Sequence, residues 1–298
     1  MHISVLREET IKGLQIQSGD IVVDGTLGGG GHTFEIIKHF GSGVKIIGID
    51  FDKDSIERTK ALIGDTPHDI VYRTIGFQDL DKVLKELNLN HVDRILLDLG
   101  ISSFQLEVAG RGFSFLKDEP LLMTMKKNPT KDDLTACDIV NNWQEENLAD
   151  IIYGFGEEKY SRKIAKAIVE MREEKPIKTT FDLVEIIEKA VGGYYKKMRI
   201  HPATRTFQAL RIATNSELVN LQEGIKKGFH SLIQGGRMAI ITFHSLEDRI
   251  VKHEFIKLKN EGYANIITKK PIIPNKSEII NNPRSRSAKL RIIEKIYE

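Results

Sequence analysis

Cysteine is almost absent from this sequence. Cys137 is the single one among 298 residues, which excludes an internal disulfide and any zinc site built from several cysteines. Long apolar runs are missing too, since none approaches the roughly twenty residues that span a bilayer. The N-terminus does not combine basic and apolar regions as a signal peptide does. These absences predict a cytoplasmic protein with no membrane partner.

Net charge is small as well. The chain carries 44 Lys and Arg against 42 Asp and Glu, a formal charge of +2. This balance does not by itself indicate a nucleic-acid binder, so any basic surface must come from local clusters. Candidate clusters are Lys196, Lys197 and Arg199, and the segment 283–291, PRSRSAKLR. Histidines and acids do not recur at ligand spacing on one predicted helix, so no metal is expected.

The most informative stretch is 20–32, DIVVDGTLGGGGH, which predicts a strand, a glycine loop and the start of a helix. Glycines there allow positive φ and let a ligand lie against bare backbone, while a helix N-terminus offers unpaired N–H groups. A second apolar run, 44–49, ends at Asp50, where a carboxylate is placed to hold two ribose hydroxyls. The pair predicts a nucleotide or nucleoside site.

The glycine pattern restricts the classes of ligand that this site could bind. A G-x-G-x-x-G fingerprint is not met because Thr33 stands where the last glycine is needed, and no Gly-Lys-Ser/Thr follows to make a P-loop. A nicotinamide-dependent dehydrogenase, which needs a pyrophosphate loop, is therefore poorly matched. The pattern is common in methyltransferases that use S-adenosylmethionine, a ligand with an adenosine and no phosphate. A glycine-rich turn without a ligand stays open as the alternative.

Strands and helices alternate from the N-terminus to residue 103, which predicts an α/β fold with a parallel sheet. Ligands of such sheets gather at the carboxyl ends of the strands. Asp24, Asp50, Phe77 and Asp98 fall at or just after such ends. The strands are expected at 21–23, 44–49, 70–73, 92–97, 237–243, 264–268 and 289–296.

Between 104 and about 201 the sequence shows no convincing strand. Short helices are expected near 135–141, 145–154, 160–173 and 180–190, with Thr179 or Thr180 as the last N-cap, and one long amphipathic helix at about 206–232. The prediction is an all-helical insertion, 105–206, within a domain made of 1–104 and 207–298.

Four further segments are too unusual in composition to be plain scaffold. They are 96–115 (LLDLGISSFQLEVAGRGFSF), 201–218 (HPATRTFQALRIATNSEL), 242–252 (TFHSLEDRIVK) and 283–291. Together with HISVLREET near the N-terminus and GFGEEKYSRKIAKAIV at 154–169, they resemble, over essentially the whole chain, the bacterial small-subunit ribosomal RNA methyltransferases of the MraW or RsmH type.

That resemblance implies a class I, Rossmann-like S-adenosylmethionine-dependent methyltransferase sheet with a helical insertion for substrate. It implies S-adenosylmethionine as methyl donor and, as target, the N4 amine of a cytidine in the decoding region of 16S ribosomal RNA, within the small ribosomal subunit. The cofactor positions that carry over are Gly30, Gly31, His32, Asp50, Phe77, Asp98 and Gln105. The oligomeric state is left open, with a homodimer as one candidate.

The chain departs from the family pattern at 122–126, Leu-Met-Thr-Met-Lys, where two acids and an arginine are missing while both methionines stay. Phe104 stands where proline is usual, and Glu107 replaces an aspartate. These changes touch the substrate side of the insertion and leave the cofactor positions intact. They give some support to a rival function, a non-catalytic ribosome assembly factor that retained the fold.

An exocyclic cytosine amine is a poor nucleophile because its lone pair is delocalised into the ring. Hydrogen-bond acceptors that draw its N–H bonds out of the ring plane localise that pair, and the catalytic candidates for this are Asp98, Ser102 and Ser103. The target base is expected to leave the RNA stack and meet an aromatic ring. Candidate substrate-binding residues are Arg111, Phe113, Phe115, His201, Arg205, His244, Arg284 and Arg286. Simple alternatives are a buried structural histidine at 244 and local ion pairs for the arginines.

Overall fold

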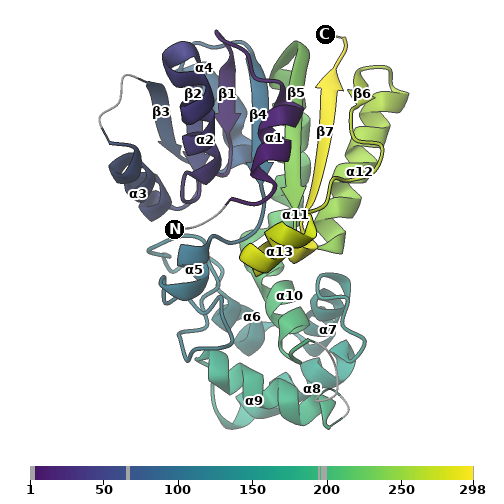
Figure 1. Ribbon diagram of the computed structural model, residues 1–298. Coiled ribbons are helices and arrows are strands. Elements are labelled where there is room, and N and C mark those ends of the chain that lie inside the picture. The colour runs from purple at the N-terminus through teal and green to yellow at the C-terminus, as the bar shows by residue number, and fades with distance from the viewer. Residues whose placement is uncertain (1–3, 65–67, 194, 196–199, 298) are drawn as a thin grey trace. The chain divides into compact units, whose positions relative to one another are not determined.

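A seven-stranded sheet in the order β3-β2-β1-β4-β5-β7-β6 forms the centre of the larger part of the chain (Figure 1). The computed structural model describes residues 4–64, 68–193, 195 and 200–297. The strands are β1 (Ile21–Asp24), β2 (Lys45–Asp50), β3 (Asp69–Thr74), β4 (Val92–Asp98), β5 (Leu232–Thr242), β6 (Ala264–Ile266) and β7 (Lys289–Lys295). Strands β1 to β5 pair in parallel, and β7 is antiparallel to both β5 and β6. The predicted α/β, class I methyltransferase fold is confirmed.

Both faces of the sheet are covered, which explains the apolar run 95–97 within β4. Successive side chains of a strand point to opposite faces. Accordingly Ile95 and Leu97 belong to one buried cluster and Leu96 to another. The helices of this part are α1 (Arg7–Leu14), α2 (Gly31–Phe40), α3 (Lys53–Ile63), α4 (Leu80–Glu86), α11 (Glu217–Ser231), α12 (Ser245–Asn260) and α13 (Lys276–Asn281).

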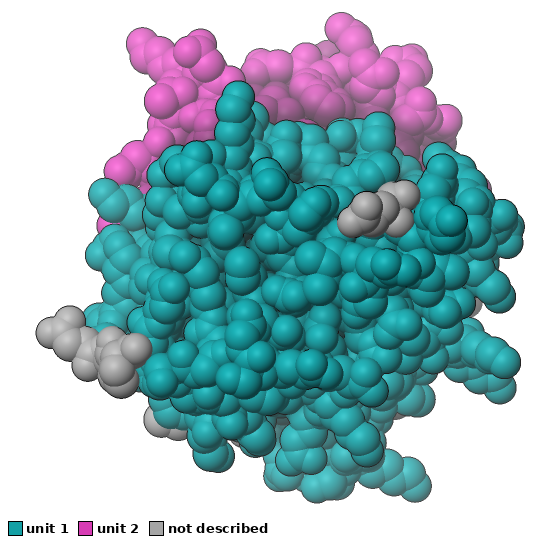
Figure 2. Space-filling view, turned by 90° about the horizontal axis from the view of Figure 1, so that it is seen from above, with its two compact units in different colours: residues 1–100, 218–298 teal, residues 101–217 magenta. Residues whose placement is uncertain are grey.

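The chain divides into two compact units, coloured separately in Figure 2. Unit 1 comprises residues 1–100 and 218–298 and contains the sheet, and unit 2 comprises 101–217. The helices of unit 2 are α5 (Ser103–Glu107), α6 (Ala136–Asn142), α7 (Glu145–Gly154), α8 (Ser161–Glu174), α9 (Thr180–Val191) and α10 (Thr204–Asn215). In the described part of this unit, strand pairing is limited to one isolated β-bridge between Pro120 and Thr179.

Unit 2 has a hydrophobic core of its own. Leu121, Ile139, Leu148, Ile164 and Leu183 are completely buried in one cluster. Helix starts are fixed by side-chain caps: Thr179 accepts a hydrogen bond from the Asp182 N–H in a capping box, which confirms the predicted N-cap. Burial and capping together account for helices in a segment without a sheet.

The predicted single helix at 206–232 is wrong. Ser216 adopts a left-handed conformation (φ 50°), so α10 ends at Asn215 and α11 begins at Glu217. Tertiary hydrogen bonds hold the break, because the Asn215 side chain accepts from the Met125 N–H (2.9 Å) and donates to the Met123 carbonyl (2.7 Å). Amphipathic periodicity continues through the break, which is why the pattern did not reveal it.

Two other boundaries differ from the expectation. Strand β5 begins at Leu232 rather than 237, so Gly235 (φ +77°) and Gly236 lie inside the strand, near an irregularity in its pairing with β4. The polar loop expected before β7 contains α13, which is capped by Asn275. Among the helices described, none has the length and apolarity required to cross a membrane.

Candidate active site

The loop after β1 is fixed to its neighbouring strands by backbone hydrogen bonds. The Gly25 N–H donates to the Leu96 carbonyl of β4 (2.9 Å), and the Leu27 N–H donates to Ile49 of β2 (2.9 Å). Gly30 has φ +73°, and a Cβ there would lie 2.5 Å from Thr59 Cγ2, so both conformation and space require glycine. Gly30 and Gly31 therefore start α2 with bare backbone, and no side chain caps this helix.

Asp50, the last residue of β2, connects this loop to the start of α3. Its Oδ2 accepts from the Gly28 N–H and its Oδ1 from the Asp52 N–H, both at 2.7 Å. Burial raises the pKa of Asp50 to about 6, against the opposing effect of these two donors. Each carboxylate oxygen keeps lone pairs for further donors, as two ribose hydroxyls would require.

His32, in the first turn of α2, lies beside Asp98 at the end of β4. Its Nε2 is 3.4 Å from Asp98 Oδ2, an ion-pair contact, and the imidazole is buried. Burial lowers the pKa of His32, but Asp98 and Asp24 outweigh that effect and raise it. The Asp24 carboxylate accepts from the Thr33 hydroxyl (2.7 Å), and burial raises the pKa of Asp24. Three ionisable groups thus lie together: Asp24 and His32 are buried, and the Asp98 side chain is 22% exposed.

Several polar atoms of this region lack a hydrogen-bond partner within the described residues. Within the described residues, Asp98 Oδ1 and both ring nitrogens of His32 are buried and make no hydrogen bond. Such groups cost free energy unless something satisfies them, and native structures hold few of them. Their position at the carboxyl ends of β1 and β4, next to bare glycine backbone, fits a polar ligand in the loop.

Phe77 closes another side of the loop. It begins the short helix after β3, and its ring lies so close to α11 that a Cβ on Gly224 would be 2.4 Å from its Cδ2. A Cβ on Gly25 would be 3.2 Å from the Phe77 Cβ. The two glycines therefore make room for the ring, which gives the site an apolar wall.

Comparison with known proteins agrees with this arrangement. The MraW methylase family matches residues 1–296. The chain belongs to this family. It is 47% identical over 310 residues to a Clostridium botulinum (strain 657) protein named ribosomal RNA small subunit methyltransferase H, covering 99% of each chain. A protein of the same name from a Sulfurihydrogenibium species is 44% identical, again over 99% of each chain.

Among solved structures, an rRNA methylase from Streptococcus thermophilus is similar to this chain. The TM-score is 0.46 with 12% identity, covering 100% of this chain and 99% of that one.

Thr26, Thr33 and Thr59 contribute to the site of this MraW-family chain and were missed in the sequence. The Thr26 hydroxyl accepts from the Asp98 N–H (2.6 Å) and the Thr59 hydroxyl donates to the Gly28 carbonyl (3.1 Å). Threonine is common in every kind of element. Of the three, only Thr26 lies inside the glycine loop, so only its position in the sequence could have marked it as a site residue.

Ser102 and Gln105, which lie in unit 2, form the capping box of α5. The Ser102 hydroxyl accepts from the Gln105 N–H (3.2 Å), and the Gln105 side-chain oxygen accepts from the Ser102 N–H (3.0 Å). Gln105 is 6% exposed. Ser103 is the first residue of α5, and its side chain lies outside what the structure describes. The capping box gives Ser102 and Gln105 a structural role in addition to any ligand contact.

Arg111, Phe113 and Phe115 belong to the core of unit 2 or its edge. Arg111 is buried, donates to the Met125 carbonyl (2.6 Å) and lies over the Phe113 ring. Phe113 is only 6% exposed, which is at odds with a role in stacking on a base. Phe115 is less buried and stacks on His201, with ring centroids 4.6 Å apart. Of the two aromatics, Phe115 stays a candidate for base contact.

The altered stretch 122–126 is well ordered by hydrogen bonds. Met123 is buried, and its N–H donates to the Arg111 carbonyl (2.7 Å). Met125 is partly buried against the same core, so both methionines serve packing. Lys126 pairs with Asp133. The departures from the family pattern have therefore not removed the packing of this segment.

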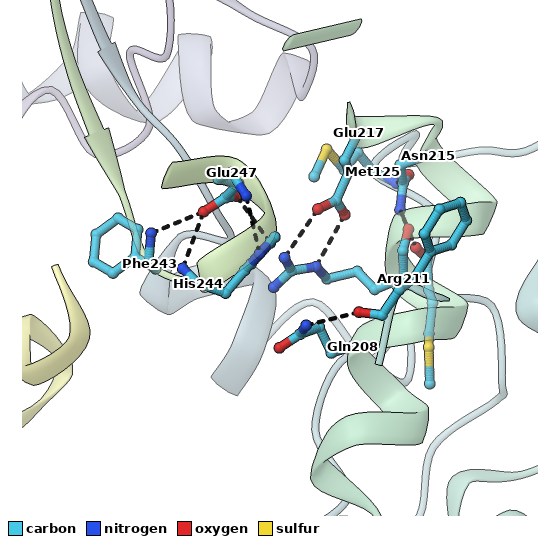
Figure 3. A network of polar contacts seen from close by, with 10 residues as sticks. Met125, Gln208, Arg211, Asn215, Glu217, Phe243, His244 and Glu247 are labelled. Atoms are coloured by element: carbon cyan, nitrogen blue, oxygen red, sulfur yellow. Dashed lines mark hydrogen bonds and ion pairs between the residues drawn. The ribbon is translucent and has the colours of Figure 1, made fainter. Parts of the chain in front are cut away.

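The polar residues of α10 hold unit 2 together. Arg211 makes two hydrogen bonds of 2.9 Å to the Glu217 carboxylate, and Gln208 donates to the Phe155 carbonyl, 2.8 Å away (Figure 3). Arg205 donates to the Glu157 carbonyl (2.9 Å). Much of the distinctive composition of 201–218 thus has a structural explanation. For Arg211 this is the local ion pair with an acid that the simpler alternative proposed for arginines.

His244 caps α12 in unit 1. Its Nδ1 accepts from the Glu247 N–H (3.4 Å), while the Glu247 carboxylate accepts from the Phe243 N–H (2.8 Å), as Figure 3 shows. Arg284 and Arg286 are exposed in the short helix that precedes β7. The basic cluster Lys196, Lys197 and Arg199 lies outside the described residues.

Proposed function

We propose that the protein transfers the methyl group of S-adenosylmethionine to the N4 amine of a cytidine in the decoding region of 16S ribosomal RNA, within the small ribosomal subunit. The observation that carries this is the contact between buried His32 and the partly exposed Asp98, whose Oδ1 is buried without a hydrogen bond in the described residues, beside the glycine loop. The names of relatives at 47% and 44% identity support the rRNA substrate. The resemblance noted in the sequence supplies the N4 specificity.

The residues present fit the cofactor. Gly30 and Gly31 offer backbone at the start of α2, Asp50 would accept the ribose hydroxyls, and Phe77 would supply an apolar wall for the adenine. S-adenosylmethionine would supply an electrophilic methyl group on a positively charged sulfur. Carboxylates line this loop, so it suits a positively charged ligand without phosphates better than it suits the pyrophosphate of a nicotinamide cofactor.

Asp98 is the residue we assign to the amine. Methyl transfer forms an N–C bond, breaks a C–S bond and releases one proton from the amine. A carboxylate that accepts an N4–H hydrogen bond localises the nitrogen lone pair before the transfer and can take the proton afterwards. The adjacent His32, whose pKa is raised by the Asp98 and Asp24 carboxylates against its burial, lies 3.4 Å from the other Asp98 oxygen and helps to hold the carboxylate in place.

A non-catalytic assembly factor would have no need of this pair. Buried polar atoms without partners destabilise a fold, so a protein released from catalysis gains by losing them. The chain keeps Asp24 and His32 buried next to the partly exposed Asp98, with polar atoms of His32 and Asp98 that make no hydrogen bond within the described residues. This argues for an active enzyme despite the changes at 122–126.

Labelled methyl transfer tests the proposal directly. Small subunits from cells that lack this enzyme are incubated with the protein and S-adenosylmethionine labelled on the methyl group. We expect label on the N4 of one decoding-region cytidine, mapped by nuclease digestion and mass spectrometry. Label on another atom or another nucleotide would correct the specificity. Tight subunit binding without label would favour the assembly factor.

Cofactor affinity is expected to fall at low pH because of Asp50. The ionised carboxylate accepts ribose hydroxyls, and burial raises its pKa to about 6 in the free protein. As pH falls from 7 to 5 the group takes up a proton, so the Kd should rise about tenfold. Calorimetry across this range checks the slope. Asp50→Ala should bind roughly ten- to a hundredfold more weakly and lose most of this pH dependence, because charged hydrogen bonds contribute about 1.5 to 3 kcal/mol.

A further inference from the structure

A groove of about 320 Å³ lies in unit 1 beyond the end of β5, apart from the loop that we assign to the cofactor. Three segments line it: the residues between β5 and α12, the chain just before and within α13, and the short helix Pro283–Ser287 with the start of β7. Among its lining residues are Phe243, His244, Ile273, Pro274, Arg286 and Lys289. Its volume is at the lower end of the range typical of small-ligand sites.

The walls of the groove are held by the chain itself. Ile272 exchanges two backbone hydrogen bonds of 2.9 Å with Leu290 of β7, which fixes the segment before α13. The N-terminal Leu6 N–H donates to Glu278 of α13 (2.7 Å). Ser285 is completely buried and donates from its hydroxyl to the Asn282 carbonyl (2.8 Å). The groove is therefore preorganised.

Its surface combines an apolar wall with a cationic lip. Ile273 is 64% exposed, and Pro274 next to it lines the groove but is itself buried. On the lip, Arg286 is exposed, and within the described part of the chain it has no ion-pair partner. Lys289 is already paired with Asp248 (2.9 Å). Arg286 is thus the cation available to an anionic ligand.

The groove starts next to the strand end that bears Asp98. Strand β5 runs parallel to β4, with Ile241 opposite Asp98, and the Leu99 N–H donates to the Ile241 carbonyl (3.0 Å). The Phe243 ring is close to Gly100, since a Cβ on that glycine would lie 3.5 Å from Phe243 Cδ2. A ligand in the groove would therefore be a near neighbour of a base at Asp98.

We propose that this groove takes a nucleotide of the same rRNA strand, adjacent to the methylated cytidine. The base would lie against Ile273 and Phe243, and its phosphate would meet Arg286. An apolar surface with one arginine suits a nucleotide, because every base has a face to stack and a phosphate to neutralise. This inference rests on the proposed function and adds a second point of contact, which fixes the register of the RNA.

Photo-crosslinking of the full-length protein tests the occupant. A benzophenone amino acid replaces Ile273, or as control Leu62, an exposed apolar residue of α3 that is 59% accessible. On small subunits from cells lacking the enzyme, we expect the Ile273 probe to crosslink 16S rRNA within a few nucleotides of the target cytidine. A crosslink to a ribosomal protein, to distant rRNA, or no stronger than from position 62 would overturn the proposal.

Charge replacement gives a second measurement. Arg286→Gln should weaken subunit binding by roughly three- to tenfold and reduce the salt slope by about one, leaving the Kd for S-adenosylmethionine unchanged. Lys252→Gln, on an exposed position of α12 outside the groove, is the matched control and should change neither. Equal effects of both substitutions would refute the groove. Methylation by the unmodified protein, run in parallel, reports separately on the proposed function.

Discussion

Asp98→Ala should lower the rate of methyl transfer by about a hundred- to ten-thousandfold while leaving the protein folded. This range is what a positioned acid or base typically contributes. The carboxylate has one oxygen 3.4 Å from His32 Nε2, and the other makes no hydrogen bond within the described residues, so its removal breaks little of the fold. Single-turnover kinetics at saturating S-adenosylmethionine measures the chemical step, and calorimetry measures cofactor binding separately.

Asp93, at the opposite end of β4, provides the matched control. It accepts a hydrogen bond from the Ile21 N–H (2.8 Å) and so has a structural role away from the site. Asp93→Ala should reduce thermal stability and leave the single-turnover rate nearly unchanged. If saturating cofactor restores the Asp98→Ala rate, Asp98 serves only to hold the cofactor, and the activation of the amine must come from another residue.

Removal of unit 2 should abolish methylation of small subunits and leave cofactor binding measurable. The variant joins Gly100 to Leu218 through a flexible Gly/Ser linker. Unit 1 keeps two buried clusters on the faces of its sheet, together with Asp50, His32 and Asp98. It loses Gln105, so the affinity for S-adenosylmethionine should fall without disappearing.

Circular dichroism and a cooperative thermal transition establish that the shortened protein is folded before activity is measured. The full-length protein and its Arg211→Ala variant, which loses the ion pair between Arg211 and Glu217 inside unit 2, are measured in the same way for comparison. Normal methylation of subunits by the shortened protein would show that residues 101–217 do not serve the RNA. Their assignment as the substrate-recognition part would then be wrong.

The sheet could be predicted because its signals are local. Strand β4 contains the apolar run 95–97 followed by an acid, and the loop at 28–31 is four glycines in succession. The helix break at Ser216 could not, since the groups that hold it, Asn215 with Met123 and Met125, come from segments far apart in the sequence. Local patterns report an element, and tertiary hydrogen bonds decide where it ends.

The same distinction between local signals and non-local contacts applies to the candidate site. Asp50 and Asp98 were identifiable from their places after strands, and so was the glycine loop. The contact between His32 and Asp98 joins α2 to β4 and has no spacing signature, and the packing of Phe77 against Gly224 is equally non-local. Phe113 was predicted to meet the target base because a base that leaves the RNA stack needs an aromatic ring, yet the Phe113 ring is buried in the core of unit 2.

The pairing of β4 with β5 has a consequence for the chain as it leaves the ribosome that makes it. β4 ends at Asp98, its partner strand begins at Leu232, and all of unit 2 is synthesised in between. During that interval the nascent sheet has β3, β2, β1 and β4, with the apolar β4 as an unpaired edge open to aggregation. Unit 2 has a core of its own, and its folding before β5 is made would shorten the search that finally brings β5 to that edge.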